Sequence, residues 1–221
     1  MAETPFESLR ARLKLPLIAA PMFLISGVEL VVAACREGVI GAFPTANCRS
    51  SDELDIWLRQ ISTHLRDEDM RLGRRSAPYC PNLIVHRSNR RLNDDLAVLQ
   101  RHRPEIVIAS VGSPEPVLRP LHDCGALVLA DVASLRHAEK AVEGGADGLV
   151  LLTAGAGGQT GWLNPLAFVR AVRTFYSGPL VLAGGINDGY ALLLGQLIGS
   201  DLALHGHEVH CDLRKPSIGR V

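Results

Sequence analysis

The chain has 221 residues, of which 47% are apolar, so we expect one substantial domain with a sizeable buried core rather than a disordered chain. The 23 basic and 23 acidic residues cancel, and this balance argues against a nucleic acid or an anionic membrane as partner. No run approaches the roughly 18 apolar residues of a membrane span, and MAETPFESLRARLK has no secretory apolar core. Five widely spaced cysteines, none in a CxxC pair, indicate reduced thiols, so we expect a cytoplasmic protein.

Short apolar runs alternate with longer amphipathic segments along the whole chain. The runs are apolar on both faces, as in strands buried in a parallel sheet. The expected strands are residues 15–22, 38–43, 80–86, 105–110, 126–132, 148–154, 179–185 and 201–206. The expected helices are residues 27–38, 51–65, 89–102, 114–125, 134–145, 164–176 and 188–199. Ser51 and Asp52 are N-cap candidates for the second of these helices.

Strand–helix units repeated to an eighth strand predict an α/β protein with a closed, TIM-type (β/α)₈ barrel. The rival fold is a doubly wound open sheet, which usually has fewer strands. The barrel is expected to be incomplete at its C-terminal end, because CDLRKPSIGRV lacks the 3.6-residue apolar period of a covering helix. We therefore assign residues 1–204 to the barrel domain and residues 205–221 to an aberrant tail.

Small and polar residues follow several of the predicted strands, where the active site of such a barrel forms. Consecutive glycines there can aim backbone N–H groups at a phosphate, which predicts a phosphorylated cofactor. The candidate cofactor-binding residues are Ala20, Pro21 and Met22 after the first strand, Asn82 in the third, Gly157 and Gly158 after the sixth, Gly184 and Gly185 after the seventh, and Gly206 after the eighth.

The order of these motifs resembles the FMN-dependent nitronate monooxygenase family, formerly called 2-nitropropane dioxygenases. The resemblance covers about residues 13–206 and is carried by PMFLISGVELVVAACREGVIGAFPT and GAGGQTG. It implies a barrel that binds FMN and oxidises nitronates, and by extension nitroalkanes, with O₂; a homodimer is left open. It places Ala20, Pro21 and Met22 near the flavin ring, Asn82 at the ring or ribityl chain, Gly157 at the flavin, and Gly184 and Gly185 at the phosphate.

Gln159 departs from the family pattern, in which a GGHxG motif carries a histidine regarded as base or substrate-positioning group. An amide cannot take a proton near neutral pH and can only orient a ligand. We expect Gln159 to be the catalytic position as a substrate-facing polar group, with a plain loop residue as the alternative. His86 is a second candidate proton carrier. A related NAD(P)H-dependent FMN reductase, such as an enoyl reductase, and a truncated inactive barrel stay open.

The segment LALHGHEVHC, residues 202–211, groups His205, His207 and His210. Their spacing is not that of the HExxH helix motif, and no metal site is predicted. At this place the family has a Met-Gly-Thr loop that gives N–H groups to the FMN phosphate. Codons permitted for residues 205–215, read one nucleotide later, spell Met-Gly-Thr-Lys (or Arg)-Phe-Ile-Ala-Thr-Cys-Glu. We therefore interpret the residues from His205 onward as the product of a one-base frameshift.

Overall fold

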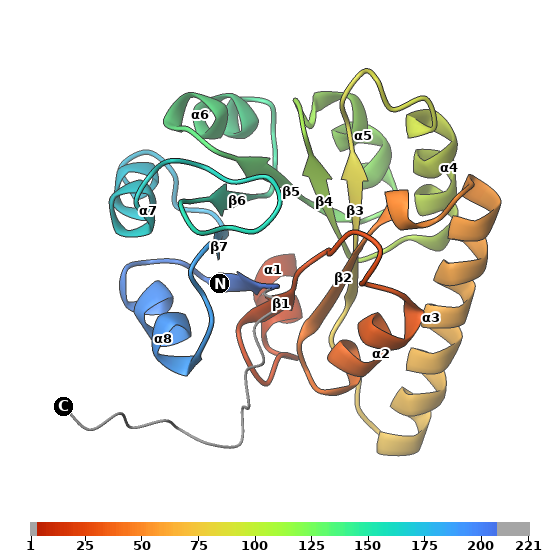
Figure 1. Cartoon of the computed structure of the whole chain (residues 1–221). Coiled ribbons are helices and arrows are strands. Elements are labelled where there is room, and N and C mark those ends of the chain that lie inside the picture. Colours follow the sequence, from red (N-terminus) through yellow and green to blue (C-terminus); the bar gives the residue numbers. More distant parts are fainter. Residues whose placement is uncertain (1–3, 207–221) are drawn as a thin grey trace.

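The computed structural model describes residues 4–206, which form a closed barrel of eight parallel strands (Figure 1). Each strand pairs with the next in the chain, and β8 pairs with β1. The strands are β1 (Leu17–Ala19), β2 (Ile40–Pro44), β3 (Tyr79–Ile84), β4 (Ile106–Ser110), β5 (Leu127–Val132), β6 (Gly148–Leu152), β7 (Leu180–Ala183) and β8 (Leu202–His205). The predicted TIM-type barrel is confirmed, and the β1–β8 pairing rules out an open sheet.

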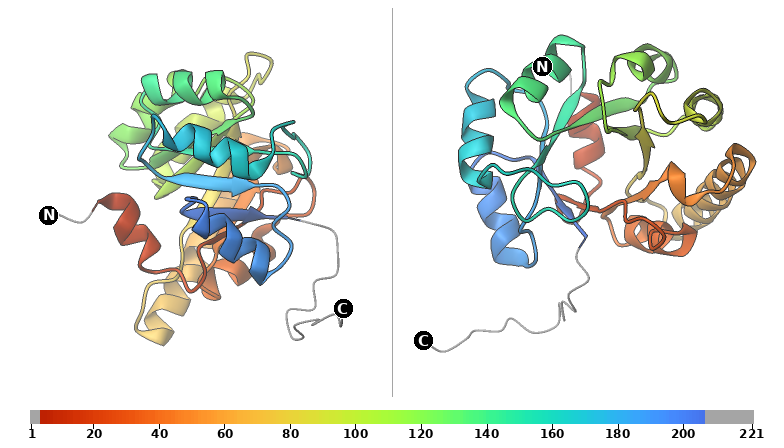
Figure 2. Two further views of the ribbon diagram at one scale, coloured as in Figure 1. Left: turned by 90° about the vertical axis from the view of Figure 1, so that its left-hand side faces the viewer. Right: turned by 45° about the horizontal axis from the view of Figure 1, so that its top comes forward.

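Helices follow the first seven strands and cover the outside of the barrel, as the right-hand view of Figure 2 shows. These helices are α2 (Val28–Arg36), α3 (Ser51–Leu72), α4 (Leu92–His102), α5 (Glu115–Asp123), α6 (Leu135–Glu143), α7 (Pro165–Arg173) and α8 (Gly189–Leu197). A short 3₁₀ helix, η1 (Thr45–Asn47), lies between β2 and α3. All seven predicted helices are present, and none of the described helices is long and apolar enough to cross a membrane.

Side chains that alternate along each strand build two apolar layers. One layer fills the barrel interior with residues such as Ile18, Ile106 and Val181. The other lies between the sheet and the helices, with Leu83 and Leu149 among its members. Because both faces of the strands are buried, the strands appear in the sequence as continuous apolar runs. The C-terminal ends of the strands lie beyond this interior layer, so their residues need not be apolar.

A helix that the sequence analysis did not predict, α1 (Pro5–Arg10), lies at one end of the barrel. Thr4 and Glu7 form a capping box, in which each side chain bonds the backbone N–H of the other. Phe6 and Leu9 pack into the interior apolar cluster. Figure 2 (left) shows α1 at the opposite end of the strands from the loop after β6. Helix α1 therefore covers the end of the barrel that lies opposite the C-terminal ends of the strands.

The second predicted helix begins at Ser51 as expected, but its N-cap and its C-terminal end differ from the prediction. The N-cap is Ser50, whose hydroxyl accepts from the Glu53 N–H at 3.2 Å, rather than Ser51 or Asp52. The helix continues to Leu72, where Gly73 ends it with a left-handed φ of 63°. Charged residues dominate this last stretch, so apolar periodicity stops before the helix does.

The end of the described chain includes the first two residues of the predicted tail. His205 is the last residue of β8 and pairs with Ala19 of β1. Gly206 follows it, and no helix follows β8 within residues 4–206. His207, His210 and the rest of the predicted frameshifted segment lie outside the described residues, so the proposed domain boundary stays a prediction.

Candidate functional site

A cavity of about 710 Å³ opens at the C-terminal ends of the strands. This volume lies within the range of roughly 300–1,000 Å³ that is typical of ligand sites. All the predicted site residues line it: Ala20, Pro21, Met22, Asn82, Gly157, Gly158, Gln159, Gly184, Gly185 and Gly206. The fold therefore brings together residues that are up to 186 positions apart, from Ala20 to Gly206. Their individual roles remain predictions.

The apolar wall after β1 is held in place by a buried hydroxyl. Ser26, which is fully buried, donates to the Ala20 carbonyl oxygen at 3.0 Å and accepts from the Met22 N–H at 3.0 Å. These two bonds clamp the Ala-Pro-Met turn across a span of six residues. The sequence analysis did not single out Ser26, because a serine before a helix is an ordinary feature.

Asn47, at the end of η1, supports the same turn from the neighbouring unit. Its amide N–H donates to the carbonyl oxygens of Met22 and Ser26, at 3.1 and 2.9 Å. Its Oδ1 accepts from the Leu24 N–H at 2.9 Å, and Leu24 has a left-handed φ of 62°. The β1 loop is thereby fixed to the end of β2. The sequence contains no local signal for this bond between segments 23 residues apart.

Opposite this wall, the loops after β6 and β7 bring glycine backbone to the cavity. At Gly184 (φ 128°) a Cβ atom would lie 2.4 Å from the Thr153 hydroxyl and 2.9 Å from the Ala156 nitrogen. A side chain there would force the two loops apart. At Gly158 the backbone is left-handed (φ 66°), and no atom lies within 4 Å of where a Cβ would be. Gly158 therefore leaves open space at the cavity and adopts a conformation that other residues rarely take.

Three polar side chains, from β3, β4 and β5, form a hydrogen-bonded row in the cavity wall. The Asn82 amide donates to the Ser110 hydroxyl. Asp131 accepts from the Ser110 hydroxyl and, at 3.1 Å, from the Val111 N–H. Burial raises the pKa of Asp131 above its usual value, although the Ser110 and Val111 bonds and the charge of His137 act in the opposite direction. Asp131 falls within the predicted fifth strand, residues 126–132, but the sequence analysis gave it no role.

Gln159 and His86 occupy different surroundings. Gln159 is exposed at the cavity, and no hydrogen bond within the described chain holds its amide, so the amide is available to a ligand. His86 is also exposed, but it bonds Ser88 at 2.8 Å and is not among the residues that line the cavity. The structure thus gives no support to His86 as a proton carrier for this site.

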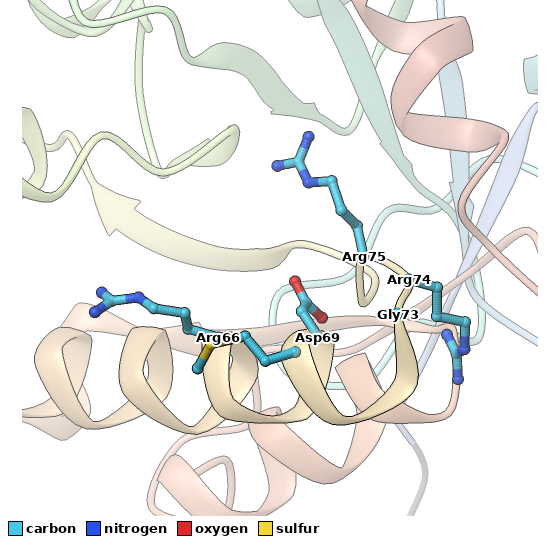
Figure 3. A pocket seen from close by; sticks show the side chains of 6 residues that line it. Arg66, Asp69, Gly73, Arg74 and Arg75 are labelled. Carbon is cyan, nitrogen blue, oxygen red and sulfur yellow. The ribbon is translucent and has the colours of Figure 1, made fainter.

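A second hollow, of about 360 Å³, lies at the C-terminal end of α3, away from the C-terminal ends of the strands (Figure 3). Its lining residues are Arg66, Asp69, Met70, Gly73, Arg74 and Arg75. Figure 3 shows the three guanidinium groups pointing away from one another rather than converging. The Asp69 carboxylate accepts hydrogen bonds from the Ser76 N–H and hydroxyl, at 2.7 and 2.6 Å, and Arg75 forms an ion pair with Glu105. These contacts indicate that the hollow has a structural role and is not a binding site.

Comparison with solved structures gives the same fold in flavin-type and other enzymes. FabK from Thermotoga maritima superposes with a TM-score of 0.78 at 21% identity, over 93% of this chain and 62% of that one. A nitroalkane oxidase from Streptomyces ansochromogenes has a TM-score of 0.76 at 21% identity, over 90% of this chain and 67% of that one. At such low identity the likeness shows the fold alone.

Curated relatives are longer than this chain. An indene-carboxyl-CoA dehydrogenase of Mycobacterium tuberculosis is 22% identical over 188 residues, which are 84% of this chain and 49% of the relative. A nitronate monooxygenase of Paraburkholderia phytofirmans is 31% identical over 121 residues, 50% of this chain and 33% of the relative. The chain thus spans at most about half the length of these relatives.

The family model described as nitronate monooxygenase matches residues 75–193, more than half of the chain. The match includes Asn82, Asp131 and the glycine loops after β6 and β7, so it covers most of the cavity wall. The resemblance inferred from the sequence is thereby confirmed, and the chain belongs to the nitronate monooxygenase family.

Proposed function

We propose that the chain is an FMN-dependent oxidoreductase that oxidises small nitronates with O₂. The observation that carries the proposal is the cavity at the strand ends, where glycine backbone faces an apolar wall. Membership of the nitronate monooxygenase family supports it, as does the name of the Paraburkholderia relative. Because the chain spans only part of the length of its relatives, the activity of the whole protein is likewise a proposal.

The residues that line the cavity fit FMN by their chemistry. A flat aromatic ring system needs apolar surface to pack on, and Ala20, Pro21 and Met22 provide it. A phosphate needs convergent N–H groups, and Gly184 and Gly185 bring backbone to the cavity without side chains. The open space at Gly158 leaves room for the group between them. In this proposal the Asn82 amide serves the ring or the ribityl chain.

Bound FMN would supply the electron acceptor, and the chain's own residues would bind and orient the substrate. A nitronate is already an anion, so its oxidation needs no base. The Gln159 amide would donate an N–H to a nitronate oxygen and fix the carbon against the ring, which is an orienting role. The apolar wall formed by Ala20, Pro21 and Met22 would keep water from the reacting carbon.

A second candidate is an FMN reductase fed by NAD(P)H, such as an enoyl reductase. The observation that favours it is Gln159, because an amide at this position removes the proton acceptor that nitroalkane oxidation would use. The two candidates share the cavity and the cofactor and differ in the electron donor.

Anaerobic reduction of the FMN-loaded chain separates these functions. We expect the purified chain with FMN to be yellow and to bleach on addition of ethyl nitronate but not of NADH or NADPH. Bleaching by NAD(P)H alone would transfer the assignment to the reductase. If equilibrium titration detects no binding of FMN, the chain is the inactive barrel and the proposed function is wrong.

A further inference from the structure

The cavity contains a carboxyl group that the proposed oxidation of nitronates does not use. Among the described residues that line the cavity, Asp131 is the only one with an acidic or basic side chain. The remaining lining residues are apolar, glycine or neutral polar. Within the described lining, Asp131 is therefore the candidate acceptor for a proton from a ligand.

The position of Asp131 is set from β4, not from its own strand. Val111 donates its N–H to Asp131 Oδ1 at 3.1 Å and holds a left-handed φ of 64°. Such a conformation is strained for a β-branched residue, and strain of this kind concentrates at functional sites. The Ser110 hydroxyl, itself held by Asn82, donates to the same carboxyl. Two donors thus fix the carboxyl, which is only half-buried and borders the cavity.

We propose that Asp131 is the general base of this cavity and takes the α-proton from a neutral carbon acid such as a nitroalkane. This inference rests on the proposed function. In the step the carboxylate forms an O–H bond as the α C–H bond breaks. The C–H electron pair becomes the C=N double bond, the negative charge moves to a nitro oxygen, and Asp131 is left neutral. The nitronate so formed is the substrate already proposed, and Asp131 returns its proton to water when the product leaves.

The surroundings of Asp131 suit this role. Burial raises the pKa of Asp131, which makes its carboxylate a stronger base than that of an exposed aspartate, and the hydrogen bonds from Ser110 and Val111 act in the opposite direction. His137, on α6, is the titratable neighbour whose charge acts on Asp131. Asp131 thereby supplies the proton acceptor that Gln159 cannot be.

Asp131→Asn tests the proposal with little change in shape, because an asparagine oxygen can still accept from the Val111 N–H. With the FMN-loaded chain we expect kcat/KM for freshly dissolved neutral nitroethane to fall at least about 100-fold, as for loss of a general base. For ethyl nitronate we expect a change within about threefold. Asp188→Asn is the matched control: Asp188 caps α8 at the same end of the barrel but does not line the cavity.

A second readout does not depend on turnover. A carboxyl whose pKa is raised on folding stabilises the protein below its unfolded pKa, and this stability is lost as the pH rises through the folded pKa. At one fixed FMN concentration, the free energy of unfolding of the wild type should therefore fall relative to that of Asp131→Asn as the pH rises above about 4, the ordinary pKa of an aspartate.

The outcomes separate this inference from the proposed function. If the wild type oxidises ethyl nitronate but Asp131→Asn keeps its nitroethane activity, Asp131 is not the base, and only the inference is wrong. An equal loss with both substrates would also overturn it, because a structural role is then sufficient. If the wild type oxidises neither substrate, the proposed function fails and the inference fails with it. Restored nitroethane activity in Asp131→Glu would support the inference, since that variant returns a carboxylate.

Discussion

At the scale of single residues, Gly158 combines a backbone that disfavours side chains with open space at the cavity. Gly158→Ala should cost about 1–2 kcal/mol of unfolding free energy, because an L-residue is strained in the left-handed region. No atom of the described chain lies within 4 Å of the added Cβ, and in our proposal FMN lies beside Gly158 in the cavity. We therefore expect the FMN dissociation constant, measured by fluorescence titration, to rise at least about tenfold, or about 1.4 kcal/mol.

Gly73 offers the matched control for this substitution. It has a φ of 63°, no atom within 4 Å of a Cβ position, and a place at the end of α3, away from the cavity. Gly73→Ala should lose a similar amount of stability and bind FMN like the wild type. Equal FMN affinity in both variants would remove Gly158 from the binding site.

Ser26 acts on the cavity only through the β1 turn. Ser26→Ala would leave the Ala20 carbonyl and the Met22 N–H without their buried partner, at a cost of about 1–3 kcal/mol. Because this turn forms the apolar wall, we expect weaker FMN binding together with lower stability in urea. Ser50→Ala, which removes the α3 cap at a cost of about 1 kcal/mol, should change stability alone. Unaltered FMN affinity in Ser26→Ala would show that the turn is rigid without its clamp.

At the scale of elements, apolar periodicity was sufficient to predict every strand and the seven outer helices. It failed for α1, whose six residues are too few for a period, and whose stability comes from the Thr4–Glu7 box and from burial of Phe6 and Leu9. It also failed at the end of α3, where ion pairs such as Arg71–Glu68 continue the helix without an apolar face. A capping box and ion pairs, which produce no apolar period in the sequence, therefore account for the two errors.

Helix α8 is apolar on its outer side as well. Tyr190, Leu193, Leu194 and Leu197 follow helical spacing, and all are exposed, Leu197 at 76%. An exposed apolar strip of this kind favours association. We expect the double variant Leu193→Gln, Leu197→Gln to reduce self-association of the chain in light scattering, with little change in unfolding, since glutamine is a good helix former.

Leu192 lies on the same helix and packs against the apolar layer between the sheet and the helices, so it offers a control position. Leu192→Gln should lower the unfolding free energy by more than about 1 kcal/mol and leave the outer strip intact. The strip would be irrelevant to association if both variants scattered light as the wild type does.

At the scale of the whole molecule, the closed barrel explains why so much of the cavity could be located in advance. Parallel strands end at one face, so residues after successive strands must meet there, whatever their separation in the chain. Ser26, Asn47, Ser110 and Asp131 were beyond this reasoning. The roles of Asn47, Ser110 and Asp131 depend on hydrogen bonds between different strand–helix units, as from the Leu24 N–H to Asn47 or from the Val111 N–H to Asp131, and no spacing in the sequence encodes them.

The proposed frameshift from His205 predicts a measurable property of the coding DNA and of the protein. Gly206 borders the cavity, at the end where we propose that glycine backbone binds the phosphate. Deletion of one base before the ATG hidden at codon 205 should replace the tail by Met-Gly-Thr and its continuation. Two backbone N–H bonds to a phosphate, each worth roughly 1.5–3 kcal/mol, would then tighten FMN binding by about two to four powers of ten. Fluorescence titration of both chains with FMN measures this difference. A stop codon within a few codons of the deletion in the repaired frame, or equal FMN affinity of the two chains, would contradict the frameshift.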